Sequence, residues 1–271
     1  MKKTTKKTAP TVVKSNKLIE ARYSLGLQEQ RLMLLALSKL NPTGKLPKER
    51  IQMRVSEYAA VFGDHKDLYA DIKAAAKSLL RRIVTIEKDD GGWKMFQVAS
   101  YAELTTKTGI IELEFHKEMA PYISELKKCF TKIELPQLAG FTSTHALRIY
   151  ENMLKWKPGT CLEISVEDLK KMLGLYDEKK KKFSYSTFKD FEKDVLKKAK
   201  EQINLHTPHF LEYQKVGGYG PKGIYLIKFF LTFKDKAGSK EIYENLNSTI
   251  TQMNGEVSEQ PSLFASDATF F

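Results

Sequence analysis

Cysteine is scarce in this sequence: among 271 residues there are two, Cys129 and Cys161. They lie far apart, and neither belongs to a CxxC or CxxH motif, so the sequence indicates neither a disulfide framework nor a zinc site. We expect two free, buried thiols. The five histidines are scattered except in HTPH, where Pro208 disfavours a helix on which the two histidines could form a regular pair of metal ligands. We therefore expect a structural role for that pair and no metal or other cofactor.

Long apolar runs are absent as well. No segment approaches the roughly 18–20 apolar residues that a membrane-spanning helix needs. The start, MKKTTKKTAP, has positive charge but no hydrophobic segment behind it. We therefore expect a cytosolic protein with no membrane association.

Signatures of catalysis are missing too. There is no G-x-x-x-x-G-K-[ST] loop to hold nucleotide phosphates, and the GGYGPKG segment has the wrong spacing and a strand on both sides. The His-apolar-His motif of metal-dependent DNA-nicking enzymes is also absent, so we predict no catalytic residue and no enzyme activity. Because the sequence has 12 tyrosines, a nicking assay with a divalent metal is the direct test of this expectation.

Positive charge is what the sequence has in excess. The 45 lysines and arginines outnumber the 33 acidic residues, which gives a formal net charge of +12. Such a surplus indicates a polyanionic partner, either nucleic acid or an anionic membrane surface. The length is sufficient for two domains that each bury a core.

One pattern occurs twice in the sequence. Residues 51–63 and 162–174 each show alternating apolar residues, then an acidic residue, then apolar residues at helical spacing. Each segment is predicted to be a strand followed by a short helix. Gly63 and Gly174 end these helices, because glycine can take the positive φ that a sharp turn after a helix requires.

A longer helix and then a β-hairpin are predicted after each turn. The hairpin tips are DDGG (89–92), which precedes a predicted strand over 95–104, and GGYGPKG (217–223). An amphipathic helix precedes each unit, over 27–40 and over 143–156. This order of elements is that of the winged helix, so the sequence predicts an α+β fold with two tandem winged-helix domains and disordered termini.

The helix after the second turn carries both aromatic residues and lysines. Its apolar residues recur at steps of three and four and form one face, predicted to be core: Phe188, Phe191, Val195, Ala199 and Ile203. The opposite face carries Ser186, Lys189, Asp190, Lys193, Lys197 and Lys200. In a winged helix this helix can enter the major groove of DNA, so the lysines are predicted to face a duplex. A merely solubilising lysine face is the alternative interpretation.

Several segments resemble one known family. The segments are NKLIEARYSLGLQEQRLMLLAL (16–37), LEFHKEMAPYISELKKCFTKIELPQL (113–138), HALRIYENM (145–153) and SYSTFKDFEKDVLKKAKEQIN (184–204). In their order and spacing they resemble the recurrent motifs of the iteron-binding plasmid replication initiators, the family of RepE-type and RepA-type proteins. The resemblance extends from residue 16 to about residue 234.

The resemblance implies a function without an enzymatic step. Such a protein binds double-stranded DNA at directly repeated origin sites (iterons) as a monomer, promotes opening of adjacent AT-rich DNA, and works with the host initiator to recruit the host replicative helicase. Dimers, formed through the first winged helix, bind an operator inverted repeat and repress the protein's own promoter, which limits copy number. The location implied is the bacterial cytoplasm. A winged-helix transcriptional regulator without a replication role is the alternative.

The resemblance also divides the chain and assigns roles. The divisions are a basic disordered arm (1–15), a first winged helix for phosphate contacts and dimerisation (16–135), a second for base reading (136–240), and a disordered tail (241–271). Base contacts are expected from Ser186, Lys189, Asp190 and Lys193, and phosphate contacts from Lys197 and Lys200. Other phosphate contacts are expected from Lys66, Lys73, Lys77, Arg81, Lys215, Tyr219 and Lys222. The acidic first hairpin tip is expected to face away from DNA.

The tail contains a short motif, QPSLF. Gln260, Ser262, Leu263 and Phe264 resemble the peptide by which bacterial replication proteins bind the β sliding clamp. In such a peptide the apolar pair can fill a pocket while the glutamine hydrogen-bonds at its rim. The alternative is a chance pentapeptide in a flexible tail.

Overall fold

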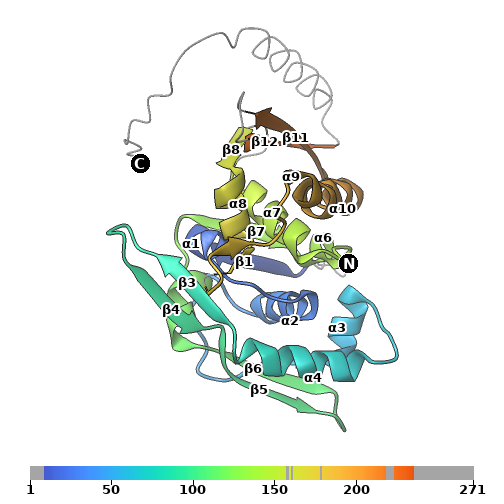
Figure 1. Ribbon diagram of the computed structural model, residues 1–271. Helices are drawn as coiled ribbons and strands as arrows, with labels where there is room; N and C mark the ends of the chain where they lie inside the picture. Colours follow the sequence, from blue (N-terminus) through green and yellow to red (C-terminus); the bar gives the residue numbers. More distant parts are fainter. Residues whose placement is uncertain (1–8, 157–158, 160, 178, 218–222, 235–271) are drawn as a thin grey trace, which may run out of the picture.

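The computed structural model (Figure 1) describes residues 9–156, 159, 161–177, 179–217 and 223–234. One winged-helix unit lies in the lower half of the view and a second in the upper half. Helix α7 (Thr144–Lys155) lies between them and packs on elements of both.

The first unit has the predicted order of elements. They are α2 (Leu27–Leu37), β2 (Ile51–Arg54), α3 (Val55–Phe62), α4 (Leu68–Leu79), β5 (Ala99–Thr105) and β6 (Ile110–Phe115). In β2 the alternation predicted from the sequence buries Ile51 and Met53 and exposes the residues between. The sheet is antiparallel with strand order β2-β6-β5. Helix α3 ends at Gly63, whose φ of 93° confirms the predicted turn.

The second unit repeats this arrangement. Its elements after α7 are β8 (Cys161–Ser165), α8 (Val166–Met172), the short strands β9 (Tyr176–Asp177) and β10 (Lys182–Phe183), α9 (Phe188–Phe191), a π-helical segment η2 (Glu192–Lys197), α10 (Lys198–His206), β11 (His209–Gly217) and β12 (Ile224–Phe233). The sheet order is β11-β12-β8, so in both units the strand before the helix-turn-helix pairs with the second strand of the hairpin. Two winged helices are therefore present, as predicted. Gly174 takes a φ of 71° after α8.

The first unit contains two hairpins where the sequence predicted one. Strand β3 (Ile83–Glu87) pairs with β4 (Trp93–Gln97) around the DDGG tip as a sheet of its own. The single strand expected over 95–104 is broken at Val98, which is fully buried and whose N–H donates to the Arg82 carbonyl. The wing that corresponds to β11–β12 is therefore β5–β6, and its tip lies at residues 106–109.

The end of the segment predicted as a disordered arm (1–15) is folded, which corrects that prediction. Thr11–Ser15 forms β1, which pairs antiparallel with β7 (Phe130–Glu134) and leads into α1 (Asn16–Glu20). Val12 and Lys14 of this strand are buried. Residues 1–8 and the whole of the expected tail lie outside the described residues.

The junction between the units is packed and charged. Between β7 and α7 lie α6 (Leu135–Ala139) and a short linker; η1 (Lys117–Met119) and α5 (Ala120–Ile123) precede β7. The predicted boundary at residue 135 thus falls at the start of a helix. Lys14 of β1 forms a fully buried ion pair with Glu151 of α7 at 2.5 Å, and Arg148 of α7 donates to the carbonyl of Ala21 at 2.8 Å.

Both cysteines are exposed, which contradicts the expectation of buried thiols. Cys129 lies in the turn before β7 with a φ of 54°, and Cys161 begins β8 at the edge of its sheet. In HTPH, His206 is exposed, whereas His209 is buried against Tyr150, whose hydroxyl lies 2.9 Å from its Nδ1. Within the described ranges, no helix is long and apolar enough to cross a membrane, and no cluster of three potential metal ligands occurs.

Candidate nucleic-acid interface

The helix after the turn of the second unit is anchored by its apolar face. Phe191, Val195, Ala199 and Ile203 are fully buried, as predicted, and Phe188 is half-buried against the ring of Phe191. The π-helical segment η2 also brings a further residue, Leu196, into the core.

Lys170 of α8 contacts this helix and the loop before it, which the sequence did not indicate. Its ammonium group donates to the carbonyl of Tyr185 at 2.7 Å and lies 5.1 Å from the centre of the Phe191 ring. Burial lowers the pKa of Lys170. The contact therefore fixes the loop that leads into the helix, and Lys170 is not available to DNA.

The start of the helix is capped by Thr187. The backbone N–H of Asp190 donates to Thr187 Oγ1 at 3.1 Å, and the Thr187 hydroxyl donates to Asp190 Oδ2 at 2.6 Å. This cap satisfies one of the free backbone N–H groups of the first turn. One oxygen of Asp190, a predicted base contact, is thus engaged within the protein, while Ser186 stays exposed just before the cap.

Three lysines of the predicted row remain exposed and uncompensated. Lys189, Lys193 and Lys197 point to solvent, and no carboxylate among the described residues lies within 4.0 Å of them. The neighbouring Lys198, by contrast, pairs with Asp194 at 3.4 Å. The positive charge of the row is therefore available to an external anion.

Two other predicted lysines are already paired within the second unit. Lys200 lies 2.6 Å from both carboxylate oxygens of Glu212 on β11. Lys215, also on β11, lies 3.1 Å from Glu192 of η2. Tyr219 and Lys222, which follow β11 in the sequence, lie outside the described residues.

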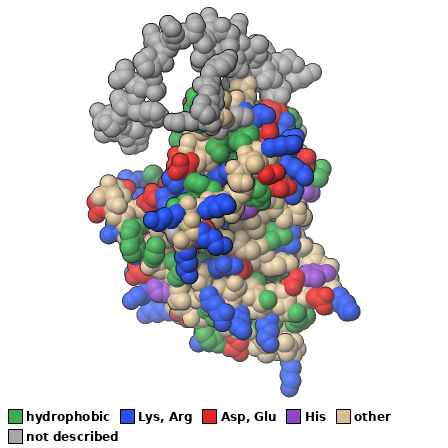
Figure 2. All heavy atoms as spheres, in the orientation of Figure 1, with side chains coloured by type: hydrophobic (Ala, Val, Ile, Leu, Met, Phe, Trp, Pro, Cys, Tyr) green, Lys and Arg blue, Asp and Glu red, His purple; other side chains and the backbone are tan. Residues whose placement is uncertain are grey.

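The first unit presents a second basic surface. The four predicted side chains on or next to α4 are all exposed, and none has a carboxylate within 4.0 Å in the described part of the chain: Lys66, Lys73, Lys77 and Arg81. Tyr69, also on this helix, is 45% exposed. Figure 2 shows Lys and Arg side chains spread over the side of the molecule in view.

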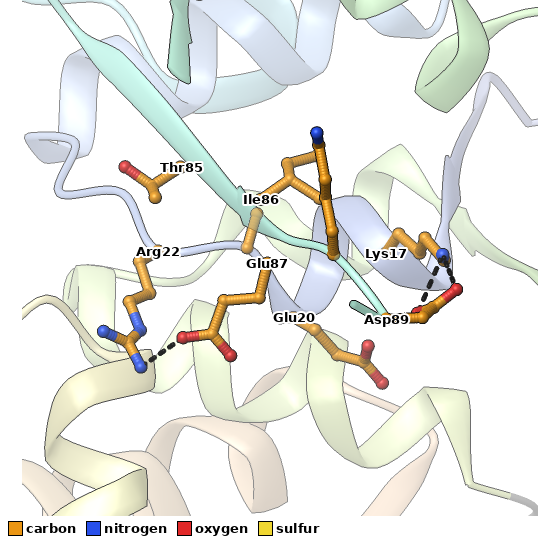
Figure 3. Close-up of a pocket in the computed structure, with 9 residues that line it drawn as sticks. Lys17, Glu20, Arg22, Thr85, Ile86, Glu87 and Asp89 are labelled. Carbon is orange, nitrogen blue, oxygen red and sulfur yellow. Dashed lines mark hydrogen bonds and ion pairs between the residues drawn. The ribbon is translucent and has the colours of Figure 1, made fainter. Parts of the chain in front are cut away.

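The acidic hairpin faces helix α1. Asp89 pairs with Lys17 at 3.2 Å, and Glu87 pairs with Arg22 at 2.5 Å, so the acidic side chains point toward basic ones across the hollow shown in Figure 3. The tip of the wing itself, β5–β6, carries an exposed lysine, Lys107, which the prediction missed because it assigned the wing to the other hairpin.

The fold and the basic helix surfaces define a tandem winged-helix protein. The chain matches the family models described as "Initiator Replication protein, WH1" over residues 11–154 and "Initiator Rep protein, WH2" over residues 165–229. These matches include most of the chain, which therefore belongs to the family of initiator replication proteins.

Individual proteins agree with this assignment. An Escherichia coli "Replication initiation protein" is 31% identical over 216 residues, which are 76% of this chain and 66% of the relative. This chain thus spans slightly less than two thirds of that relative's length. An Escherichia coli "Uncharacterized 27.6 kDa protein" is 23% identical over 215 residues, 74% of this chain and 88% of the relative.

A solved structure has the same fold. It is the "Pi initiator protein in complex with iteron DNA", with a TM-score of 0.72 and 22% sequence identity; the match covers 84% of this chain and 99% of that chain. At this identity the similarity establishes the shared arrangement of both winged helices.

Proposed function

We propose that this protein initiates plasmid replication by binding repeated origin sites in duplex DNA, with the second winged helix reading the bases. One observation carries the proposal: in a chain of the initiator family, Lys189, Lys193 and Lys197 stand exposed and uncompensated on the helix that a winged helix places in the major groove. The complex of the structurally similar Pi initiator with iteron DNA supports the same mode of binding.

Each candidate side chain has a role in this proposal. Ser186, Lys189 and Lys193 lie at or near the start of the helix and read base edges, together with the remaining oxygen of Asp190. Lys197 lies one turn further along and meets phosphate. Lys200, Lys215, Tyr219 and Lys222 are further phosphate contacts; the first two must exchange their carboxylate partners to reach DNA.

The first unit contributes backbone contacts and dimerisation. Its exposed basic residues on α4, with Lys107 on the wing, meet phosphate beside the site of the second unit. The monomer binds single iterons, and a dimer formed through the first unit binds an operator inverted repeat and represses the protein's own promoter. No enzymatic step belongs to this function.

A selection experiment tests the DNA-binding proposal. Duplexes are enriched from a randomised pool with the full-length protein and then footprinted. We expect one enriched sequence that is protected in the major groove. Lys189→Ala and Lys193→Ala should lose affinity for that sequence, with Lys198→Ala as the control because Lys198 is already paired. Enrichment of no sequence would reject the proposal.

A replication assay separates an initiator from a regulator. The coding sequence and its flanking DNA are placed on a plasmid without another origin, and transformants are counted in several hosts. We expect replication and opening of AT-rich DNA, with recruitment of the host helicase and host initiator. Specific DNA binding without replication in any host would favour the transcriptional regulator.

The β sliding clamp is a further proposed partner. Gln260, Ser262, Leu263 and Phe264 lie outside the described residues, so the proposal is based on the sequence of QPSLF alone. A labelled tail peptide is titrated with purified clamp beside a Leu263→Ala, Phe264→Ala double variant. Saturable binding of the first peptide only is expected, and equal non-saturating signals would reject the partner.

A further inference from the structure

In the second unit, a seam of side-chain contacts joins the helix after the turn (α9, η2 and α10), called the recognition helix below, to the wing (β11 and β12). Asn204 of α10 exchanges two hydrogen bonds with the backbone of Leu211 on β11, at 2.6 and 3.1 Å. Further toward the start of the helix, Lys200 pairs with Glu212. The seam thus holds β11 alongside the helix that carries the lysine row.

Glu192 ends this seam nearest the DNA-facing half of the helix. Its side chain is 17% exposed, whereas that of Lys215 is 44% exposed. Glu192 Oε1 accepts a hydrogen bond from the Tyr213 hydroxyl at 3.1 Å and lies 3.1 Å from Lys215 Nζ. Tyr213 and Lys215 are two positions apart on β11, so their side chains leave the strand on the same face, and both reach Glu192.

The tyrosine fixes the position of the carboxylate. The Tyr213 ring packs on the buried ring of Phe229, its partner on β12, with 6.2 Å between ring centres. Burial and the negative charge of Glu192 raise the pKa of Tyr213 well above its ordinary value, so the hydroxyl remains a donor. Tyr213 therefore fixes the position of the Glu192 carboxylate, and the flexible side chain of Lys215 pairs with it there.

The carboxylate of Glu192 is unfavourable for DNA binding, because it lies on the helix proposed to contact the duplex. Glu192 lies between Lys189 and Lys193 in the sequence and repels phosphate, while it neutralises a lysine of the wing. A pair with one half-exposed partner is weak enough for a phosphate to displace it. The displacement is favoured only where base contacts hold the helix, and with it the wing, close to the duplex.

We propose that Glu192 is a specificity-determining residue whose carboxylate withholds Lys215 from DNA phosphate until the recognition helix is seated on its site. The proposal rests on the DNA-binding function proposed above. Its consequence is that Glu192 weakens binding to mixed sequence more than binding to the selected sequence.

The test compares two duplexes over a range of salt concentrations. One is the duplex selected from the random pool, and the other has the same bases shuffled. Glu192→Gln removes the charge but keeps an acceptor for Tyr213. We expect this variant to bind the shuffled duplex more tightly than the wild type does. On that duplex the log-log salt slope should be steeper by about 0.9, as for one more phosphate contact. The ratio of selected to shuffled affinity should therefore be smaller. The double variant Glu192→Gln, Lys215→Ala should return the slope to that of the wild type.

Glu201→Gln is the matched control. Glu201 lies on α10 and lines the same hollow as Glu192 and Lys215. It is exposed and forms no ion pair within 4.0 Å among the described residues. Glu201→Gln removes the same negative charge as Glu192→Gln. A change in salt slope shared by both variants would therefore be a general charge effect and would overturn the proposal. Equal weakening on both duplexes with an unchanged slope would mean a structural role only and would also overturn it.

A second variant keeps the proposal testable if Glu192→Gln does not fold. Lys215→Ala should reduce the salt slope by about 0.9 on the selected duplex and by less than half of that on the shuffled one. Equal reductions on both would contradict the proposal. If no sequence is enriched from the pool, the proposed function fails, and the comparison of Glu192→Gln with Glu201→Gln on mixed sequence still tests whether Glu192 withholds Lys215 from phosphate.

Discussion

The buried ion pair between Lys14 and Glu151 should make the β1 segment indispensable to the fold. The side chains of Lys14 and Glu151 are 2% and 0% exposed, and the buried guanidinium of Arg148 lies 3.9 Å from the second oxygen of Glu151. Glu151→Gln leaves two buried cations without their shared anion. Loss of one partner of a buried pair costs about 3–5 kcal/mol, because the remaining charge keeps its desolvation penalty.

Urea denaturation followed by circular dichroism measures this cost. With a slope near 3 kcal/mol per molar urea, the midpoint for Glu151→Gln should fall by roughly 1–2 M. Lys14→Met alone should cost a similar amount. The double variant Lys14→Met, Glu151→Met replaces the pair by apolar side chains of similar size, and we expect it to recover at least half of the loss.

Two results would refute this reasoning. An unchanged midpoint for Glu151→Gln would mean that the pair contributes nothing at the junction. A double variant as unstable as the sum of the two single variants would mean that the two side chains act independently, so that packing and not charge compensation sets the cost.

Three further predictions follow from the second unit. Lys189→Ala and Lys193→Ala should each cost about 1–3 kcal/mol on the selected duplex, measured by fluorescence anisotropy; equal loss on shuffled DNA would assign them to phosphate. Phe191→Ala should lower the free energy of unfolding by about 3–5 kcal/mol and weaken DNA binding indirectly, and an unchanged melting temperature would contradict its place in the core. Burial, assisted by the charge of Lys234, lowers the pKa of His209 to about 4. The unfolded chain therefore binds the extra proton first, and stability should fall by up to about 3 kcal/mol as the pH drops from about 6.5 to about 4; His209→Asn should flatten that profile, and an equally steep profile would count against it.

Local periodicity explains why the helices were predictable. The spacing of Phe191, Val195, Ala199 and Ile203 depends only on the 3.6-residue turn, and all four are buried as predicted. Leu196 was missed because the prediction counted only residues that recur at steps of three and four, and Leu196 directly follows Val195.

Strand pairing limited the prediction of the first wing. The two hairpins of the first unit both contain glycine at a turn, and their strands have similar composition. Only contact with β2, which is distant in sequence, identifies β5–β6 as the wing. For the same reason the partner of β1 was not predictable: β7 follows more than a hundred residues later.

The candidate interface divides in the same way. Charge, spacing and the position after a turn were sufficient to identify the helix that carries Lys189 and Lys193, because these depend on neighbours along one helix. Which lysines remain available was decided only by the tertiary structure. Glu192 and Glu212 reach Lys215 and Lys200 across the helix and the wing, and an ion pair between distant segments depends on how those segments pack and leaves no periodic trace in the sequence.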